Sequence, residues 1–174
     1  MKFQVIENFL DYAVLQNMYK FMTSDNMPYY FCKKFTTQAI QNSKSFFFIH
    51  HLYKKETNEK SFVFDNYTKE LFLKLNPNEI IRAQINNFII QDTNIVSEAH
   101  VDEPDIIEKN LEPYKTALFY LNTCNGGTIL HTDKGDIKIN SKENRLLIFD
   151  GNISHRAVTQ TDTTLRLNIN VVFR

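Results

Sequence analysis

The 174-residue sequence has no tryptophan, only two cysteines, four glycines and four prolines, and no excess of either charge. The two cysteines, Cys32 and Cys124, lie far apart without the CxxC spacing of a zinc ribbon, so reduced thiols are expected. Lys+Arg and Asp+Glu both number 20, so the sequence carries no electrostatic signal for bulk nucleic-acid or membrane binding. No apolar run reaches the roughly 18 residues of a membrane span, and the N-terminus is too polar for a signal peptide, which favours a cytosolic protein.

The hydrophobic content is ample for a folded core. Hydrophobic residues make up 43% of the chain, and 15 of them are phenylalanine, which excludes a disordered protein. A chain of this length fits one domain, and no linker or repeat interrupts it. We therefore predict a single domain, 1–174, in which 1–79 support a core formed by 80–174.

The supporting part is expected to alternate strands and helices. Apolar residues recur at helical spacing over 12–23, directly after Asp11, a residue type that caps helix N-termini. Aromatic-rich runs at 29–35 and 45–53 predict strands, and a second helix is expected over 67–75. These helices would lie on the outside of the core.

From residue 80 onward, short strand-like runs follow one another, with turn signals such as Asn125-Gly126-Gly127 between them. Their predicted ranges are 80–91, 95–101, 115–122, 127–132, 135–140, 145–149, 153–159 and 164–173. This spacing favours a mainly β fold, a double-stranded β-helix or jelly roll with flanking helices.

Two of these runs alternate polar and apolar residues. The polar positions are Arg82, Gln84 and Asn86 in the first run and Arg166, Asn168 and Asn170 in the last. In most half-buried strands the polar face is solvated. Here the helices need an apolar surface to cover, so we favour polar faces that line the barrel interior, where they require partners or a ligand.

The tripeptide His100-Val101-Asp102 is the first candidate for a metal site. In a strand, residues two apart point to the same face, which would place one imidazole and one carboxylate together. Two histidines and one carboxylate suit ferrous iron, because they leave coordination positions open. The third candidate is His155, at the start of a later strand, whereas His131 is expected at the surface.

His50 and His51 close an earlier predicted strand. Adjacent residues of a strand face opposite sides, so they cannot both reach one site, and one is expected to be structural. A role of either at a substrate entrance is the alternative.

A carboxylate-binding group is predicted near the metal site. Arg166 carries a planar, permanently charged guanidinium that can bind a carboxylate at two points. Tyr120 is either a core tyrosine or a hydroxyl donor to the same carboxylate. The sequence thus places metal ligands and a carboxylate clamp on neighbouring strands.

Together these elements resemble the 2-oxoglutarate- and iron(II)-dependent oxygenase superfamily, in particular its prolyl-hydroxylase-like members. The similarity is carried by His100-Val101-Asp102, Phe119-Tyr120-Leu121-Asn122, Gly126-Gly127, Arg145 to Asp150, His155 and Arg166. Among them the chain is most similar to short oxygenases encoded by marine tailed phages. Two departures stand out: Asn144 replaces a turn glycine, and Asn86 or Phe88 replaces the tyrosine that precedes the HxD motif in prolyl hydroxylases.

The resemblance implies a dioxygenase that uses Fe(II), 2-oxoglutarate and O2. His100, Asp102 and His155 would hold the iron, and Arg166 would pair with the far carboxylate of 2-oxoglutarate, helped by Tyr120 and Asn168. The carboxylate of Asp102 implies hydroxylation, since relatives that halogenate carry a small residue in its place.

The prolyl-hydroxylase-like character implies a protein or peptide side chain as the substrate. A small metabolite is the next choice and a nucleobase the third, which the neutral net charge disfavours. Two alternatives remain open: a non-enzymatic jelly-roll module, such as a virion component or sugar binder, and a cupin-like enzyme with another metal, in which Arg166 would be dispensable.

Overall fold

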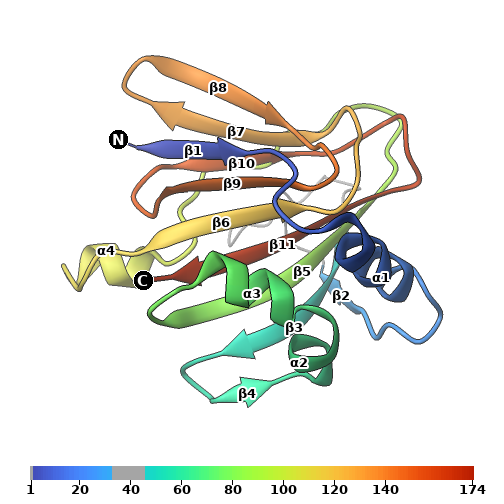
Figure 1. Cartoon of the computed structure of the whole chain (residues 1–174). Coiled ribbons are helices and arrows are strands. Elements are labelled where there is room, and N and C mark those ends of the chain that lie inside the picture. Colours follow the sequence, from blue (N-terminus) through green and yellow to red (C-terminus); the bar gives the residue numbers. More distant parts are fainter. Residues whose placement is uncertain (1, 33–45) are drawn as a thin grey trace.

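Two antiparallel β-sheets form the body of the molecule, and helices cover the outer face of the larger sheet (Figure 1). The computed structural model describes residues 2–32 and 46–174. The strands are β1 (Phe3–Ile6), β2 (Tyr30–Cys32), β3 (Phe47–Lys54), β4 (Glu59–Lys60), β5 (Ile80–Ile89), β6 (Lys115–Tyr120), β7 (Gly127–Thr132), β8 (Gly135–Asn140), β9 (Arg145–Asp150), β10 (His155–Val158) and β11 (Leu165–Phe173). The helices are α1 (Tyr12–Met22), α2 (Phe62–Tyr67), α3 (Lys69–Leu75) and α4 (Pro104–Glu108).

The larger sheet has the strand order β1-β9-β6-β11-β5-β3-β2, with β4 paired to β3, and the smaller sheet has the order β10-β7-β8. From β6 to β11 the chain passes back and forth between the two sheets, which is the topology of a jelly roll. The predicted jelly-roll core with flanking helices is confirmed.

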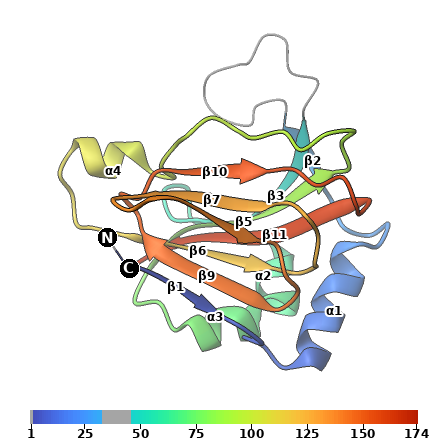
Figure 2. The same cartoon turned by 90° about the horizontal axis from the view of Figure 1, so that it is seen from above.

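Helix α1 begins and packs as its sequence predicts. The Asp11 side chain accepts a hydrogen bond from the backbone N–H of Ala13 at 2.8 Å, which caps the first turn. Its apolar stripe, Leu15, Met18 and Met22, is fully buried against the outer face of the larger sheet (Figure 2). None of the helices in the described chain is long and apolar enough to span a membrane.

Strands β5 and β11 have the two faces that the alternation predicts. They pair with each other along their length, and their apolar side chains, such as Ile85 and Ile169, join the core beneath the helices. The polar side chains of both strands point the other way, into the space between the sheets. The polar faces therefore line the interior, and the apolar faces are covered by the helices.

A second, smaller core lies between the two sheets. It consists of Leu118, Tyr120, Leu130, Leu147, Phe149 and Ile153. Because this cluster fills only part of the interior, the space beside the polar faces of β5 and β11 stays open as a pocket.

The second predicted helix corresponds to α3, which ends at the predicted residue 75 and starts two residues later than predicted. The sequence reasoning missed α2, which precedes α3 and meets it at Thr68. The Ser61 side chain accepts a hydrogen bond from Val63 N–H and caps α2, so helical structure starts earlier than the apolar spacing indicates.

The predicted strand at 95–101 is wrong. This segment makes only two isolated bridges, Val96 to Val158 and His100 to His155. Between them Ser97 stays hydrogen-bonded to Ala157, and its hydroxyl takes the place of a backbone acceptor, so no regular ladder forms. The strand predicted at 29–35 corresponds to β2, and its part beyond residue 32 lies outside the described residues.

Asn144 ties the N-terminal segment to the turn before β9. Its backbone φ is 62°, in the left-handed region that asparagine tolerates better than most residues. Its buried carboxamide accepts a hydrogen bond from Leu10 N–H at 2.7 Å and donates one to Leu10 C=O at 2.8 Å. Asparagine therefore supplies an anchor that a glycine at this turn would lack.

We expect Asn144→Ala to lower the free energy of unfolding by about 2–4 kcal/mol. Two buried hydrogen bonds contribute about 0.5–1.5 kcal/mol each, and a left-handed backbone costs alanine roughly 1 kcal/mol more. Urea denaturation measures the change. Asn144→Gly is the control, because it removes both bonds without the backbone strain, and its loss should be smaller by about 1 kcal/mol. A wild-type midpoint for Asn144→Ala would contradict the anchoring role.

Candidate metal centre

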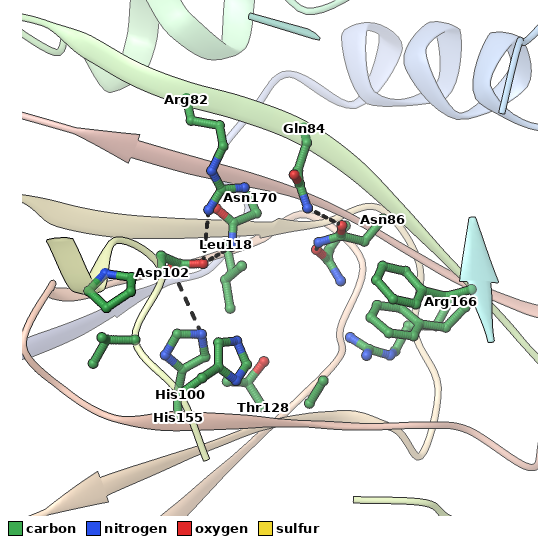
Figure 3. Close-up of a pocket in the computed structure, with 16 residues that line it drawn as sticks. Arg82, Gln84, Asn86, His100, Asp102, Leu118, Thr128, His155, Arg166 and Asn170 are labelled. Atoms are coloured by element: carbon green, nitrogen blue, oxygen red, sulfur yellow. Dashed lines mark hydrogen bonds and ion pairs between the residues drawn. The ribbon is translucent and has the colours of Figure 1, made fainter. Parts of the chain in front are cut away.

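A pocket of about 550 Å³ opens between the two sheets (Figure 3). One wall is the polar face of β5 and β11, with Arg82 and Asn170 near one end and Arg166 at the other. The opposite wall carries His100 and His155, which lie across from Asp102 at the Arg82 end. The pocket thus joins the predicted metal ligands and the predicted carboxylate clamp in one cavity.

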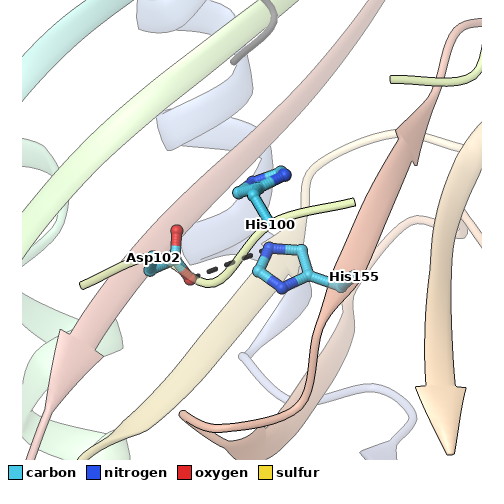
Figure 4. A group of neighbouring side chains, drawn as sticks. All are labelled: His100, Asp102 and His155. Atoms are coloured by element: carbon cyan, nitrogen blue, oxygen red, sulfur yellow. Dashed lines mark ion pairs between the residues drawn. The ribbon is translucent and has the colours of Figure 1, made fainter. Parts of the chain in front are cut away.

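His100, Asp102 and His155 form a cluster that could hold a metal ion (Figure 4). One ligand atom from each side chain lies within 4.8 Å of the other two. His155 Nε2 is 3.8 Å from Asp102 Oδ2, and the two imidazole centroids are 4.4 Å apart. The structure therefore brings together the three residues that the sequence singled out.

The two histidines are positioned by the backbone. His100 and His155 exchange a pair of backbone hydrogen bonds, at 3.0 and 2.9 Å, across the isolated bridge. Each ring places Nδ1 near a carbonyl of its own segment, Glu98 C=O at 3.1 Å for His100 and Ile153 C=O at 3.4 Å for His155. A proton on Nδ1 leaves Nε2 free to bind a metal. His100 and Asp102 thus converge without the regular strand that the sequence suggested.

Asp102 is held as an ionised carboxylate. Its Oδ1 accepts hydrogen bonds from Arg82 Nη2 and Asn170 Nδ2, both at 3.1 Å, and its Oδ2 accepts one from Thr116 Oγ1 at 2.7 Å. Burial alone would raise the pKa of Asp102, but the neighbouring His155 and Arg82 and the Thr116 hydrogen bond outweigh it and lower the pKa to about 2. Burial lowers the pKa of His155, which favours the neutral ring that a metal requires.

Arg166 closes the other end of the pocket. The residue is 1% exposed, and its Nε and Nη2 have no hydrogen-bond partner within the described part of the chain. Its guanidinium carbon lies 4.0 Å from the ring centroid of Phe88, which is itself stacked on Phe47 at 5.0 Å. Burial lowers the pKa of the guanidinium, yet an arginine side chain stays charged in proteins. A ligand carboxylate would satisfy both free donors at once.

Gly126 makes room for this arginine. A Cβ at position 126 would lie 3.0 Å from Arg166 Cδ and 2.8 Å from the Val158 carbonyl oxygen. Any side chain there would push the guanidinium stem out of place, so the glycine is required by close packing.

Tyr120 does not line the pocket but contacts a residue that does. It is fully buried, and its hydroxyl donates to Thr128 Oγ1 at 2.8 Å, while Thr128 itself lines the pocket. Asn168 lines the pocket and accepts a hydrogen bond from Asn86 Nδ2 at 3.0 Å. A contact of Tyr120 or Asn168 with a co-substrate stays a prediction.

Several residues that line the pocket or contact Asp102 escaped the sequence reasoning. Thr116 and Thr128 belong to β6 and β7 and carry no motif, and Phe88 was noted only as standing in place of a tyrosine. Arg82 and Asn170 were assigned to polar faces without a role. The alternation of β5 and β11 was the one available signal for the last two.

The remaining histidines lie elsewhere. His50 is buried, with Nδ1 2.7 Å from Pro28 C=O and Nε2 2.6 Å from Ser61 Oγ, so both ring nitrogens are engaged. His51 is exposed on the opposite face of β3. His131 pairs with Asp136 in the hairpin of β7 and β8. None of the three lines the pocket that contains His100.

The chain is thus a jelly roll whose interior holds two histidines, an aspartate and a buried arginine. Solved structures with the same fold include oxygenases. A prolyl hydroxylase from Trichoplax adhaerens, solved in complex with a peptide fragment of a hypoxia inducible factor oxygen degradation domain, is 16% identical with a TM-score of 0.69, over 98% of this chain and 82% of that one. A 2OG-Fe(II) oxygenase family oxidoreductase from Burkholderia pseudomallei is 11% identical with a TM-score of 0.68, over 98% and 84%.

A prolyl-4-hydroxylase from Pseudomonas putida is 13% identical with a TM-score of 0.64, over 99% of this chain and 92% of that one. No family model and no curated protein matches the sequence. At such identities the likeness establishes the fold: the chain has the fold of the 2OG-Fe(II) oxygenases over nearly its whole length.

Proposed function

We propose that this chain is an iron(II)- and 2-oxoglutarate-dependent dioxygenase that hydroxylates a C–H bond. One observation carries the proposal: the ligand atoms of His100, Asp102 and His155 lie within 4.8 Å of one another in a pocket that also contains the buried guanidinium of Arg166, whose Nε and Nη2 have no hydrogen-bond partner among the described residues. Two neutral imidazoles and one carboxylate leave positions open on ferrous iron. A guanidinium beside them suits a co-substrate that carries a carboxylate.

The residues present fit both groups. His100, Asp102 and His155 would hold the iron. The lowered pKa values of Asp102 and His155 favour the ionised carboxylate and the neutral imidazole that metal binding requires of these two residues. Arg166 would bind the far carboxylate of 2-oxoglutarate, with Thr128 as a hydroxyl donor beside it. When bound, the iron and 2-oxoglutarate supply the oxidising power for hydroxylation, with O2 consumed and succinate and CO2 formed. Leu118 and Ala157 contribute apolar surface to the pocket.

We infer a protein or peptide side chain as the substrate. The Trichoplax adhaerens neighbour was solved with a peptide fragment, and it aligns with 98% of this chain. A small metabolite is the second candidate and a nucleobase the third. We further propose that the chain is similar to phage oxygenases, that it forms a single domain and that it is located in the cytosol.

The proposed activity predicts succinate formation from 2-oxoglutarate. Purified protein supplied with Fe(II) and 2-oxoglutarate should form succinate slowly when O2 is admitted, and faster when a peptide that contains the substrate side chain is added. Liquid chromatography with mass detection measures succinate and the oxygen atom gained by the peptide. Zn(II) in place of Fe(II) is the control and should give no succinate, because zinc has no redox chemistry. A protein that binds neither Fe(II) nor 2-oxoglutarate would contradict the proposal.

A further inference from the structure

Three neighbouring strands of the larger sheet each direct one hydrogen-bond donor at Asp102. Arg82 comes from β5, Asn170 from β11 and Thr116 from β6, and β11 lies between the other two strands. We call Arg82, Asn170 and Thr116 the Asp102 donor set. Their side chains converge on one carboxylate. Arg82 and Asn170 lie on the pocket wall opposite the two histidines (Figure 3).

The donor set treats the two carboxylate oxygens differently. Oδ1 accepts two hydrogen bonds, from Arg82 and Asn170, so its lone pairs are occupied. Oδ2 accepts only one, from Thr116, and is the oxygen that lies 3.8 Å from His155 Nε2. The carboxylate is therefore oriented with one specified oxygen toward the imidazoles.

The backbone does not explain this orientation. His100 is fixed by its pair of backbone bonds with His155, but no backbone-to-backbone hydrogen bond of the described chain involves Asp102. The segment around Asp102 also lies outside any regular strand. Side-chain contacts must therefore place this carboxylate.

Arg82 contacts both Asp102 and the residue that follows it. Its Nη2 donates to Asp102 Oδ1 at 3.1 Å while its Nε donates to Glu103 Oε1 at 2.9 Å, so one planar fork grips two successive residues. The Glu103 backbone N–H in turn donates to the Tyr114 hydroxyl at 3.0 Å. The Asp102 side chain is 6% exposed and that of Arg82 17%, so water competes little for these contacts.

We propose that Arg82, Asn170 and Thr116 are positioning residues of the metal centre, which hold Asp102 so that Oδ2 alone is presented to the metal. The inference rests on the metal site of the proposed function. Loss of one donor lets the carboxylate rotate, and the site then binds a divalent ion less tightly. In metal sites generally, loss of such an outer partner costs roughly 10- to 100-fold in affinity or activity.

A purely electrostatic role of Arg82 would have the opposite sign. A cation beside a ligand carboxylate repels the incoming metal ion, so removal of the charge alone would tighten metal binding. Thr116 offers a second test that is free of charge effects, because Thr116→Val removes the hydroxyl at nearly constant volume. The two residues together separate orientation from charge.

The experiment titrates Co(II) into the protein without 2-oxoglutarate, and it reads both the affinity and the visible absorption of the bound ion. Thr116→Val and Arg82→Gln are expected to bind Co(II) about 10- to 100-fold more weakly, with an altered spectrum. Thr116→Ser, which keeps the hydroxyl, should restore wild-type affinity and spectrum. Glu103→Gln, which removes only the negative charge of the outer partner of Arg82, should stay within about threefold of wild type, since the contact with Asp102 remains.

Wild-type or tighter Co(II) binding by Thr116→Val and Arg82→Gln would overturn the inference. Equal losses in Glu103→Gln and Arg82→Gln would also overturn it, because Arg82 would then act through the fold of the segment. If Arg82→Gln does not fold, the Thr116 pair decides alone. A protein that binds Co(II) with the expected order of variants but forms no succinate would support the inference and contradict the proposed function.

Discussion

The His155→Ala variant is expected to form no succinate and to bind Fe(II) at least about 100-fold more weakly than wild type, because loss of an outer partner alone already costs up to roughly that much. His155 supplies the one cluster ligand from β10, and it faces the Asp102 oxygen from the opposite wall of the pocket. Without it, an imidazole and a carboxylate remain, which is too few ligands to retain iron. Anaerobic Fe(II) titration and succinate formation measure the two effects.

Two comparisons give this result its meaning. His131→Ala removes a histidine that pairs with Asp136 in the hairpin of β7 and β8, so its turnover should equal that of wild type. His155→Gln keeps the volume of the buried side chain and controls for a cavity. If the chain is a non-enzymatic binding module, the His155→Ala variant should still bind the partner of that module. Succinate formation by this variant at the wild-type rate would refute the role of His155 as a metal ligand.

The sequence predicted the ligands His100, Asp102 and His155 for a reason that is only partly right. It placed the first two on one strand, where alternation would put them on one face. In the structure that strand is absent, and their convergence depends on the bridge from His100 to His155 and on side chains that reach Asp102. The His-x-Asp spacing still predicts the site, because residues two apart lie on the same side of the chain both in a regular strand and in this irregular segment.

Sequence patterns correctly predict those structural features that depend only on neighbouring residues in the chain. The alternation in β5 and β11 predicts which side chains face the interior, since the face of a residue within a strand follows from its parity. The polar wall of the pocket could therefore be predicted before any strand order was known.

Contacts between strands could not be predicted in this way. Thr116 meets Asp102 because β6 pairs with β11 in a register that sets Thr116 opposite Val172, and no local pattern specifies that register. Phe88 lies under Arg166 because the two residues are register partners in β5 and β11. Such neighbours require the tertiary pairing of segments 56 (172 − 116) and 78 (166 − 88) residues apart in the sequence.

Replacement of Arg166 with methionine is expected to weaken 2-oxoglutarate binding by roughly 30- to 5,000-fold, which corresponds to the 2–5 kcal/mol typical of losing one member of a buried charged pair. The same change should stabilise the ligand-free protein. Two unmade hydrogen bonds cost about 1–3 kcal/mol each, and the contact with Phe88 offsets about 2 kcal/mol, so a gain of about 0–4 kcal/mol is expected. Calorimetric titration with Mn(II) in place of iron measures the affinity, and urea denaturation measures the stability.

The opposite signs of the two effects identify the role of Arg166. A structural arginine would stabilise the ligand-free fold, so its loss would lower the free energy of unfolding and change 2-oxoglutarate binding only indirectly. Arg166→Lys keeps the charge without the planar fork, and its affinity should fall between those of wild type and Arg166→Met. Phe88→Leu removes the aromatic face and should destabilise the ligand-free protein. If Arg166→Met instead binds 2-oxoglutarate as wild type does, the guanidinium is no carboxylate clamp, and the cupin-like alternative with another metal becomes the better account of the His100 cluster.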